Sequence, residues 1–505
     1  MAYKDFREWV ELLQSEGELA EVKVEVDWNK EIAAISRNVT SKEGPALLFS
    51  NIKGYKDGDF RRVFTGGLGA RRRVAMALGL SKDSTYKVII RTMKDRLRQP
   101  IKPTLVATGP VKENIVKGDD IDLFKIPVPF LHSLDGGRYI DTACAIITRD
   151  PDTGGINLGL YRGMIADKNH IGKLLAATAH WGNHFAKYRD RGEPMPVAIA
   201  YGIDPTLLMC SAAAIQHPSG TSEYDFAGGL KGASVEVVKC ETLDLLAPAR
   251  AEIVVEGFIS PDPKTFVMEG PFGEYPGTYG GMASPKPAVA VKCITYRTDP
   301  IYTSNDEGTS PGRWCESPYY CTPVYCALAW NALEAAGVPN VLDVWGNPVS
   351  LGNNLRVKIK KIYRGHAKQV ACALWGTTIV AYMAKNVIVV DDDIDIHNDE
   401  DVDWALSYRT NAEMHDIQFF HVCIGSMLDP SYPMSSRDTQ KYGQGKASRV
   451  LIDATVNWEL EPEEQYGGTR FPPLCTTPDP EDQARVEKRW KEYGIAGTPL
   501  TTTKS

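Results

Sequence analysis

The middle of the chain, residues 106–305, consists of short β-branched runs separated by turn signals. The runs are YIDTACAIIT, PVAIAYGI, ASVEVVKC, AEIVVEGFI and AVAVKCITY. Segments such as DPDTGG, GIDP and SPDP lie between them, and clusters of Gly, Pro and Asp favour turns. Many short strands with frequent turns predict a barrel or a folded sheet. One helix is expected inside this region, over residues 170–188.

The two flanking regions mix helical and strand patterns, which predicts an α/β (mixed α+β) protein. An amphipathic helix is expected at the N-terminus, with Phe6, Val10 and Leu13 on one side together with Leu12, and Gly17 as its end. LLFSNIKGY and KVIIRTM read as strands, and ARRRVAMALGL as a short helix. From residue 320 onward, helical runs such as PVYCALAWNALEAAG and HAKQVACALWGTTIVAYMA alternate with the strand runs VLDVW and VIVVDD.

Length and these changes in pattern divide the chain into three parts and a tail. With 505 residues, about three domains are expected. We place an N-terminal α/β domain at 1–105, a β-rich domain at 106–310 and a C-terminal α/β domain at 311–490. Residues 491–505 are expected to form a flexible tail.

Composition excludes several classes of protein. The chain has 57 basic and 64 acidic residues, a net charge of −7, and this does not suit a nucleic-acid binder with a basic face. No apolar run approaches the ~18 residues of a membrane helix. The first residues lack the pattern of a signal peptide, and the ten cysteines are spread singly without CxxC, so we expect buried thiols in a cytoplasmic protein. For three of these thiols, the alternative to simple burial is that they line a pocket: Cys315, Cys321 and Cys326.

Common catalytic motifs are absent from the sequence. It contains no GxSxG, HExxH or Walker A motif and no GxGxxG after a strand. TGGLGARRR at 65–73 superficially resembles a phosphate-binding loop, but it lacks the Walker spacing. We interpret it as a turn followed by a basic helix.

Three segments of the β-rich region carry candidate chemistry. Asn157, His180 and Glu223 supply an amide oxygen, an imidazole and a carboxylate, which is a plausible set for Mn²⁺ or Mg²⁺. They lie far apart in the sequence, so a histidine that serves only the packing of its helix remains the alternative. His184 shares a helix face with His180.

Glu269 and Glu274 flank the turn Gly-Pro-Phe-Gly. Two carboxylates beside a cation such as Arg162 can differ in protonation at neutral pH, which suits a general acid next to an anion-binding arginine. Two solvent-facing loop glutamates remain the alternative.

Taken together, these motifs resemble a known family. NLGLYR, SEYDFAGGLKG and EGPFGEYPGTY, in this order and spacing, resemble the UbiD family of reversible decarboxylases that use prenylated FMN, and most of all its ferulic acid and aromatic acid decarboxylase type. YRGHAKQVACALWG, VIVVDDDIDIHN and GKASRVLIDAT resemble the C-terminal half of that family. The resemblance covers roughly residues 5–490. It implies a central split β-barrel that binds the flavin and a C-terminal domain that dimerises, in homodimers or homohexamers, with a flavin prenyltransferase as the supplier of the cofactor.

The resemblance also implies roles for particular residues. Arg162, Glu269 and Glu274 match the catalytic Glu-Arg-Glu trio of the family. Asn157, His180 and Glu223 match the ligands of its divalent metal, Mn²⁺ or Mg²⁺, which bridges to the flavin phosphate with K⁺ nearby. Lys368 resembles the lysine that reaches the phosphate, and the match leaves His184 a structural role. The implied reaction is non-oxidative decarboxylation, with Arg162 fixing the carboxylate and Glu274 donating the proton.

The substrate is expected to be an aromatic, heteroaromatic or α,β-unsaturated carboxylic acid. Tyr275, Trp314, Tyr319 and Ile424 are the candidate pocket residues, because their segments are rich in aromatic and soft side chains. Packing in the core is the alternative for these aromatic residues. Three other functions remain open: operation as a carboxylase, a flavin-binding accessory subunit without turnover, and a flavin-independent metal hydrolase using His180, His184 and Glu223.

Overall fold

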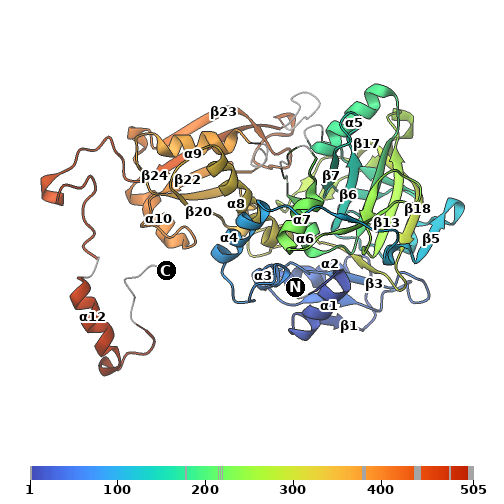
Figure 1. Ribbon diagram of the computed structural model, residues 1–505, viewed down its shortest axis with the longest axis horizontal. Coiled ribbons are helices and arrows are strands. Elements are labelled where there is room, and N and C mark those ends of the chain that lie inside the picture. Colours follow the sequence, from blue (N-terminus) through green and yellow to red (C-terminus); the bar gives the residue numbers. More distant parts are fainter. Residues whose placement is uncertain are drawn as a thin grey trace.

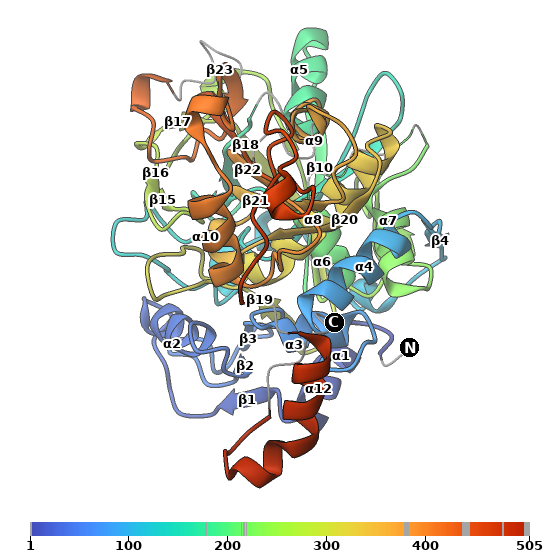
Figure 2. The same cartoon turned by 90° about the vertical axis from the view of Figure 1, so that its left-hand side faces the viewer.

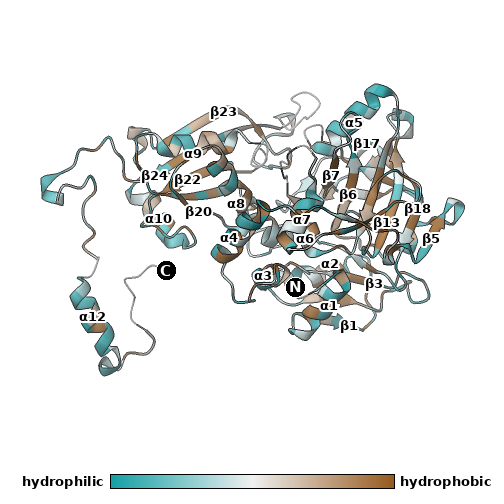
Figure 3. Ribbon diagram, in the orientation of Figure 1, coloured by the Kyte–Doolittle hydropathy of each residue, from teal (hydrophilic) through white to brown (hydrophobic). Residues whose placement is uncertain are grey.

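The computed structural model describes residues 3–176, 179–213, 215, 218, 220–377, 383–436, 445–476 and 479–498. Figure 1 shows a mixed α/β chain in three parts: the N-terminal part below the β-rich central part, and the C-terminal part beside it. Hydrophobic residues are frequent along the central strands, whereas the last helix is mainly hydrophilic (Figure 3). No described helix is long and apolar enough to cross a membrane.

The N-terminal part is a four-stranded sheet with helices. Its elements are α1 (Phe6–Ser15), β1 (Leu19–Val22), α2 (Glu31–Thr40), β2 (Ala46–Phe49), β3 (Arg62–Thr65), α3 (Arg71–Ala77) and α4 (Tyr86–Leu97). The strand order is β1-β2-β3-β19, where β19 (Ile301–Thr303) arrives from the end of the central part. Helix α1 forms as expected: Asp5 caps it by accepting from the amides of Arg7 and Glu8, and its apolar side is buried.

The prediction of a strand for KVIIRTM is wrong, because these residues belong to helix α4. The Thr85 side chain accepts a hydrogen bond from the Val88 amide and caps the helix. Ile89, Ile90 and Met93, together with Leu97, are buried at helical spacing, whereas Val88 is exposed. The packing of one helix face therefore outweighs the strand preference of the β-branched residues.

The glycine-rich segment at 65–73 holds a carboxylate of the same chain. The amides of Gly66 and Leu68 donate to the Glu316 side chain, at 2.9 Å and 2.5 Å. Glu316 directly precedes helix α8 (Ser317–Ala335), so this contact anchors α8 to the N-terminal part. Helix α3 follows the loop, as expected for a turn and a basic helix.

The central part is built on an eight-stranded antiparallel sheet. Seven strands follow the order β7-β6-β10-β13-β18-β9-β8, and β5 also pairs with β18. Their bounds are β5 (Asn114–Lys117), β6 (Cys144–Arg149), β7 (Ile156–Gly159), β8 (Gly163–Ile165), β9 (His170–Lys173), β10 (Met195–Tyr201), β13 (Ile253–Ile259) and β18 (Ala288–Tyr296). Smaller strands are β4 (Thr104–Leu105), β11 (Glu236–Lys239), β12 (Leu246–Pro248), β14 (Val267–Glu269), β15 (Phe272–Gly273), β16 (Tyr279–Gly280) and β17 (Ser284–Lys286).

The two edges of this sheet are joined by a very short link. Strand β7 ends at Gly159 and β8 begins at Gly163, although they lie at opposite ends of the strand order. Four residue steps span at most ~14 Å, so the sheet must curl until its edges approach one another. The sheet is thus a curled half-barrel, and residues 160–162 form the link between its edges.

The helix expected over residues 170–188 is shorter than predicted. Residues His170–Lys173 form strand β9, and the helix α5 spans His180–Arg191. The run HIGK pairs with β18 and β8, and these ladders satisfy its backbone groups. Two further helices, α6 (Pro205–Ala212) and α7 (Glu223–Lys231), complete the central part.

The C-terminal part is a five-stranded mixed sheet with helices. The strand order is β20-β21-β22-β24-β23, and the bounds are β20 (Val341–Gly346), β21 (Asn354–Ile359), α9 (His366–Trp375), β22 (Asn386–Val390), α10 (Asp399–Tyr408), β23 (Ile417–Gly425) and β24 (Gly445–Ala454). Part of the run HAKQVACALWGTTIVAYMA, residues 378–382, lies outside the described residues. After β24 the chain runs out to helix α12 (Pro480–Arg489), which stands apart from the body in Figures 1 and 2.

Candidate active site

Arg162 binds two glutamates, so the structure brings the expected trio together. Its Nη1 donates to Glu274 Oε1 at 2.6 Å, and its Nη2 donates to Glu269 Oε2 at 3.0 Å. Glu269 is fully buried and Glu274 is 9% exposed. The alternative of two solvent-facing loop glutamates therefore does not describe this pair.

The three residues come from two short connections. Arg162 is the last residue of the link between β7 and β8, Glu269 ends β14, and Glu274 follows β15. Gly280, on the paired strand β16, lies under the trio: a Cβ there would stand 2.7 Å from Glu274 Cγ. A glycine at this position thus lets β16 approach the Glu274 side chain.

Burial and the neighbouring charges determine the protonation of the site. Burial raises the pKa of the Glu274 carboxyl; the positive charge of Arg162 opposes this rise and the negative charge of Glu269 adds to it. Burial alone would lower the pKa of Arg162, but Glu274 and Glu269 outweigh it and hold that pKa above its ordinary value. The site can therefore keep a permanent cation beside a carboxylic acid.

Tyr139 is a member of the site that sequence reasoning missed. Its hydroxyl donates to Glu269 Oε1 at 2.8 Å, and its ring packs on Phe272 with centroids 4.0 Å apart. Burial, followed by the charge of Glu269, raises the pKa of Tyr139 well above its ordinary value, so the hydroxyl stays a neutral donor. Tyr139 lies in the segment GGRYID, which matches no catalytic motif, so no signal in the sequence indicated its role.

A second polar cluster supports the segment that carries Glu274. The Gly273 amide donates to Asp135 Oδ1 at 2.9 Å, and the other oxygen of Asp135 lies 3.0 Å from Nδ1 of His132. The Nε2 atom of His132 lies 2.7 Å from the carbonyl oxygen of Glu307. Burial, with a contribution from the charge of Glu274, raises the pKa of Glu307 to about 7. The sequence contained no spacing that indicated this cluster.

Two short contacts connect β7, which carries Asn157, with His180 and with Glu223. Asn157 lies on β7, His180 is the first residue of α5 and Glu223 is the first residue of α7. Asn157 Oδ1 lies 3.2 Å from His180 Nδ1, and the Leu158 amide donates to Glu223 Oε2 at 2.8 Å. Asn157 and Glu223 are almost fully buried.

This set fits a divalent cation by its chemistry. An amide oxygen and a carboxylate are ligands for Mg²⁺ or Mn²⁺, and an imidazole is a common ligand for transition metals. Within the described residues, the buried Nδ2 of Asn157 has no hydrogen-bond partner. This amide nitrogen is a hydrogen-bond donor, so the partner that it lacks is an acceptor such as a phosphate oxygen and not the cation itself.

His184 does not join this set through its ring nitrogen Nδ1. That atom lies 3.0 Å from the hydroxyl of Thr148 on β6, and the side chain is buried. The contact agrees with a structural role and gives no support to a hydrolase that uses His180, His184 and Glu223 together.

The remaining candidates are scattered. Lys368 is exposed on α9. The Tyr275 hydroxyl lies 3.4 Å from Ser426 Oγ, and Tyr275 lines a cavity of about 310 Å³ between the central and C-terminal parts. Ile424 is 38% exposed on β23.

Trp314 and Tyr319 pack against one another with ring centroids 5.8 Å apart. The Trp314 amide donates to Ser41 of the N-terminal part, and Tyr319 is buried in the main core. Cys315, Cys321 and Cys326 are buried as well. These contacts match the core-packing alternative for this segment.

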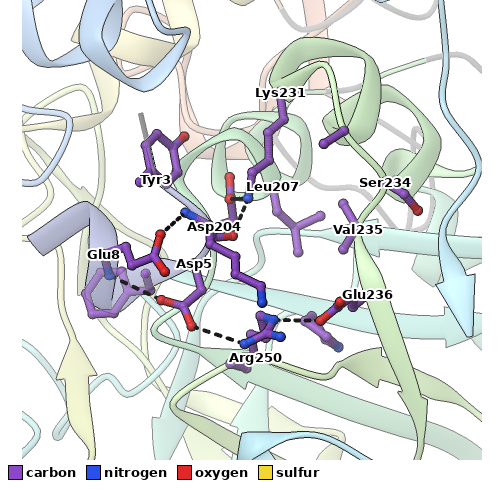
Figure 4. Close-up of a pocket in the computed structure, with 15 residues that line it drawn as sticks. Tyr3, Asp5, Glu8, Asp204, Leu207, Lys231, Ser234, Val235, Glu236 and Arg250 are labelled. Atoms are coloured by element: carbon purple, nitrogen blue, oxygen red, sulfur yellow. Dashed lines mark hydrogen bonds and ion pairs between the residues drawn. The ribbon is translucent and has the colours of Figure 1, made fainter. Parts of the chain in front are cut away.

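A separate surface pocket of about 360 Å³ lies near the N-terminus (Figure 4). Its lining holds several charges, but they neutralise each other: Lys231 pairs with Asp204, and Arg250 pairs with Glu236 at 2.6 Å. None of the trio lines this pocket.

The curled sheet holds a buried arginine between two carboxylates, one of which has a raised pKa, and such perturbed groups in a buried site are typical of enzymes. The chain belongs to the UbiD family, as models of three of its domains match. They are described as the N-terminal domain, the Rift-related domain and the C-terminal domain of 3-octaprenyl-4-hydroxybenzoate carboxy-lyase, and they cover residues 10–93, 104–309 and 319–454. The family expected from the motifs is thus confirmed, and with it a UbiD-class enzyme.

Relatives match along nearly the whole chain. Pyrrole-2-carboxylic acid decarboxylase of Pseudomonas aeruginosa is 32% identical, over 97% of this chain and 98% of that protein. The closed form of vanillic acid decarboxylase from Sedimentibacter hydroxybenzoicus has a TM-score of 0.86 and 32% identity, covering 98% of this chain and 99% of the other.

A third relative is the UbiD-class enzyme HmfF from Pelotomaculum thermopropionicum. Its complex with FMN has a TM-score of 0.77 and 32% identity, covering 92% of this chain and 96% of that chain. An evolved dimeric form in complex with prFMN has a TM-score of 0.75 and 31% identity, covering 90% and 96%.

Proposed function

We propose that this protein catalyses the reversible non-oxidative decarboxylation of an aromatic, heteroaromatic or α,β-unsaturated carboxylic acid with prenylated FMN and a divalent metal. The observation that carries the proposal is Arg162 held between Glu269 and Glu274 in a buried site. This arrangement offers a cation for a carboxylate and an acid for the proton that decarboxylation consumes.

Each residue of the trio has a distinct task in this proposal. Arg162 binds the carboxylate of the substrate and fixes the bond that will break. Glu274 enters the reaction protonated, because burial raises its pKa, and gives its proton to the carbon that has lost CO₂. Its carboxylate is then stabilised by Arg162 until a proton from solvent restores the acid. Glu269 anchors Arg162 from the other side.

The cofactor supplies what side chains cannot. A bound prenylated flavin provides the electron sink for the electrons left on an sp² carbon after CO₂ departs. Asn157, His180 and Glu223 would hold Mn²⁺ or Mg²⁺ for the flavin phosphate, with K⁺ nearby, and Lys368 is proposed to contact the phosphate. The buried, oxygen-rich character of Asn157 and Glu223 supports this assignment.

An aromatic or heteroaromatic acid is the favoured substrate. The printed activities of two relatives, on pyrrole-2-carboxylic acid and on vanillic acid, support this choice. Tyr275 is the strongest candidate for a pocket wall, since it directly follows Glu274 and lines a cavity. Trp314, Tyr319 and Ile424 are weaker candidates for the pocket.

We also propose two kinds of partner. The prFMN bound to HmfF supports a flavin prenyltransferase as the supplier of the cofactor. Self-association through the C-terminal part, as a homodimer or homohexamer, is supported by α12, which buries none of its side chains within the described chain.

A single substitution tests the proposal. The protein is coexpressed with a flavin prenyltransferase, and CO₂ release is measured over a panel of aryl and heteroaryl acids. Glu274→Gln should lower turnover at least a thousandfold and leave the flavin absorbance unchanged, because the amide cannot donate the proton. The exposed Glu193→Gln is the matched control. Wild-type turnover in Glu274→Gln, or no CO₂ from any acid, would contradict the proposal.

A further inference from the structure

Lys173 and Asp141 form a buried ion pair below the trio. Lys173 Nζ lies 2.5 Å from Asp141 Oδ2, and both side chains are fully buried. Taking two charges out of water is costly unless further hydrogen bonds satisfy them. The Tyr201 hydroxyl donates to the other oxygen of Asp141 at 2.5 Å, and Lys173 donates to the Tyr161 carbonyl at 3.1 Å.

The pair holds the backbone on both sides of Arg162. Lys173 contacts Tyr161, the residue before it. Asp141 lies against Gly163, the residue after it: a Cβ on Gly163 would stand 1.9 Å from Asp141 Oδ2 and 2.7 Å from Lys173 Nζ. Any residue other than glycine would therefore displace the pair from the link that carries Arg162.

The same ammonium reaches the start of helix α5. Lys173 Nζ lies 5.3 Å from the ring centroid of Trp181, a cation–π distance. Trp181 in turn stacks parallel on Tyr161, with centroids 4.4 Å apart. Since Trp181 follows His180, one buried charge contacts both the link of Arg162 and the helix end that carries His180.

We propose that Lys173 and Asp141 are a positioning pair that sets Arg162 against Glu274 and ties this arrangement to the His180 end of α5. The functional meaning rests on the proposed function, because it takes the roles of Arg162 and His180 from there. The pair touches neither substrate nor cofactor in this role; it acts through the backbone of Tyr161 and Gly163 and through the ring of Trp181.

The test removes the charges and keeps the shapes. Lys173→Met alone leaves the Asp141 carboxylate buried without its cation, so a lower melting temperature is expected. Lys173→Met/Asp141→Asn carries neither charge and should regain much of that loss. Lys187→Met/Asp150→Asn is the matched control, since it neutralises an ion pair of 2.7 Å on the more exposed side of α5.

Two measurements separate positioning from mere stability. In the double variant, amide hydrogen exchange in peptides covering 157–166 and 179–186 should be at least fivefold faster than in the wild type. kcat/KM should fall at least tenfold, and its alkaline limb should move to higher pH, because Arg162 lowers the pKa of Glu274 only while it stays beside it. The Lys187/Asp150 control should change none of these values.

The failures of the two proposals are distinguishable. Wild-type exchange rates and wild-type kcat/KM in the Lys173/Asp141 double variant would overturn the positioning pair, even if Glu274→Gln is inactive. If no acid yields CO₂, the proposed function fails, but the exchange experiment still decides whether the pair holds the link. An unfolded Lys173→Met variant leaves the double variant to decide.

Discussion

At the scale of the residue, two glutamates on one guanidinium have unequal surroundings. Glu269 is fully buried and accepts from both Tyr139 and Arg162, whereas Glu274 accepts from Arg162. Donors that point at a carboxylate favour its charged form. The difference supports the proposed division, in which Glu269 anchors Arg162 and Glu274 donates the proton.

Tyr139→Phe tests this division. Removing the hydroxyl takes one donor from a buried carboxylate, so the free energy of unfolding should fall by about 1–3 kcal/mol, as measured by chemical denaturation. kcat/KM should fall about tenfold, because Glu269 then holds Arg162 less firmly. Tyr296→Phe, which removes a 2.8 Å hydrogen bond to Asp59 away from the site, is the control. A Tyr139→Phe enzyme with unchanged kcat/KM would argue against the assignment.

The pH dependence follows from the raised pKa of Glu274. Decarboxylation requires the protonated acid, so kcat/KM should be highest below this pKa and fall as the pH rises through it. The raised pKa of Glu274 affects folding stability in the same direction. A carboxyl with a raised pKa contributes stability at low pH, and this contribution is lost as the pH rises through that pKa. A profile of kcat/KM against pH checks this, and a rate that rises steadily toward alkaline pH would contradict it.

Sequence reasoning found residues by motif and missed those that act through contacts. The trio and the set Asn157, His180 and Glu223 are named from conspicuous segments. The structure joins Arg162 to both glutamates, and it places His180 and Glu223 in contact with β7. Tyr139, Lys173 and Asp141 belong to no motif of their own. Their side chains matter because the curled sheet packs them beneath the link, and no spacing along the chain encodes that.

At the scale of the element, helices α5 and α7 both contact strand β7. Asn157 is the second residue of strand β7, and helices α5 and α7 begin at His180 and Glu223. The N-terminus of a helix favours negative charge, so two helix ends that both contact β7 suit a phosphate together with its metal.

Glu223→Ala tests this convergence. It removes the proposed carboxylate ligand and also leaves the Leu158 amide without its acceptor. Flavin and metal retained through purification should fall at least tenfold, measured by the flavin-to-protein absorbance ratio and by metal analysis. Glu236→Ala, which removes a partly exposed carboxylate paired with Arg250, should retain both. Full retention of flavin and metal in Glu223→Ala would count against a ligand role.

Local patterns predicted most elements, but they failed where the apolar residues of a segment fit both a strand and a helix. KVIIRTM is rich in β-branched residues, yet its apolar positions also fit one helix face, and packing against the core selected α4. HIGK was read as part of a long helix, but the edges of β18 and β8 offered it backbone partners as strand β9. Short apolar runs do not distinguish helix from strand by themselves.

At the scale of the whole molecule, the three parts are interlocked. Strand β19 leaves the central part to complete the N-terminal sheet, and Glu316 ties α8 to the glycine-rich loop. Tyr275, next to Glu274, meets Ser426 of the C-terminal part. The environment of Glu274 therefore depends on how the C-terminal part lies against the central part.

The sequence by itself determined the class of fold and the family and supplied the candidates for the catalytic groups, because these reside in local composition and in motif order. Only the tertiary structure decided that Arg162 closes a curled sheet, that Tyr139 distinguishes two glutamates, and that Lys173 and Asp141 lie beneath the link. Those features come from contacts between residues distant along the chain, and such contacts exist only once the sheet has curled.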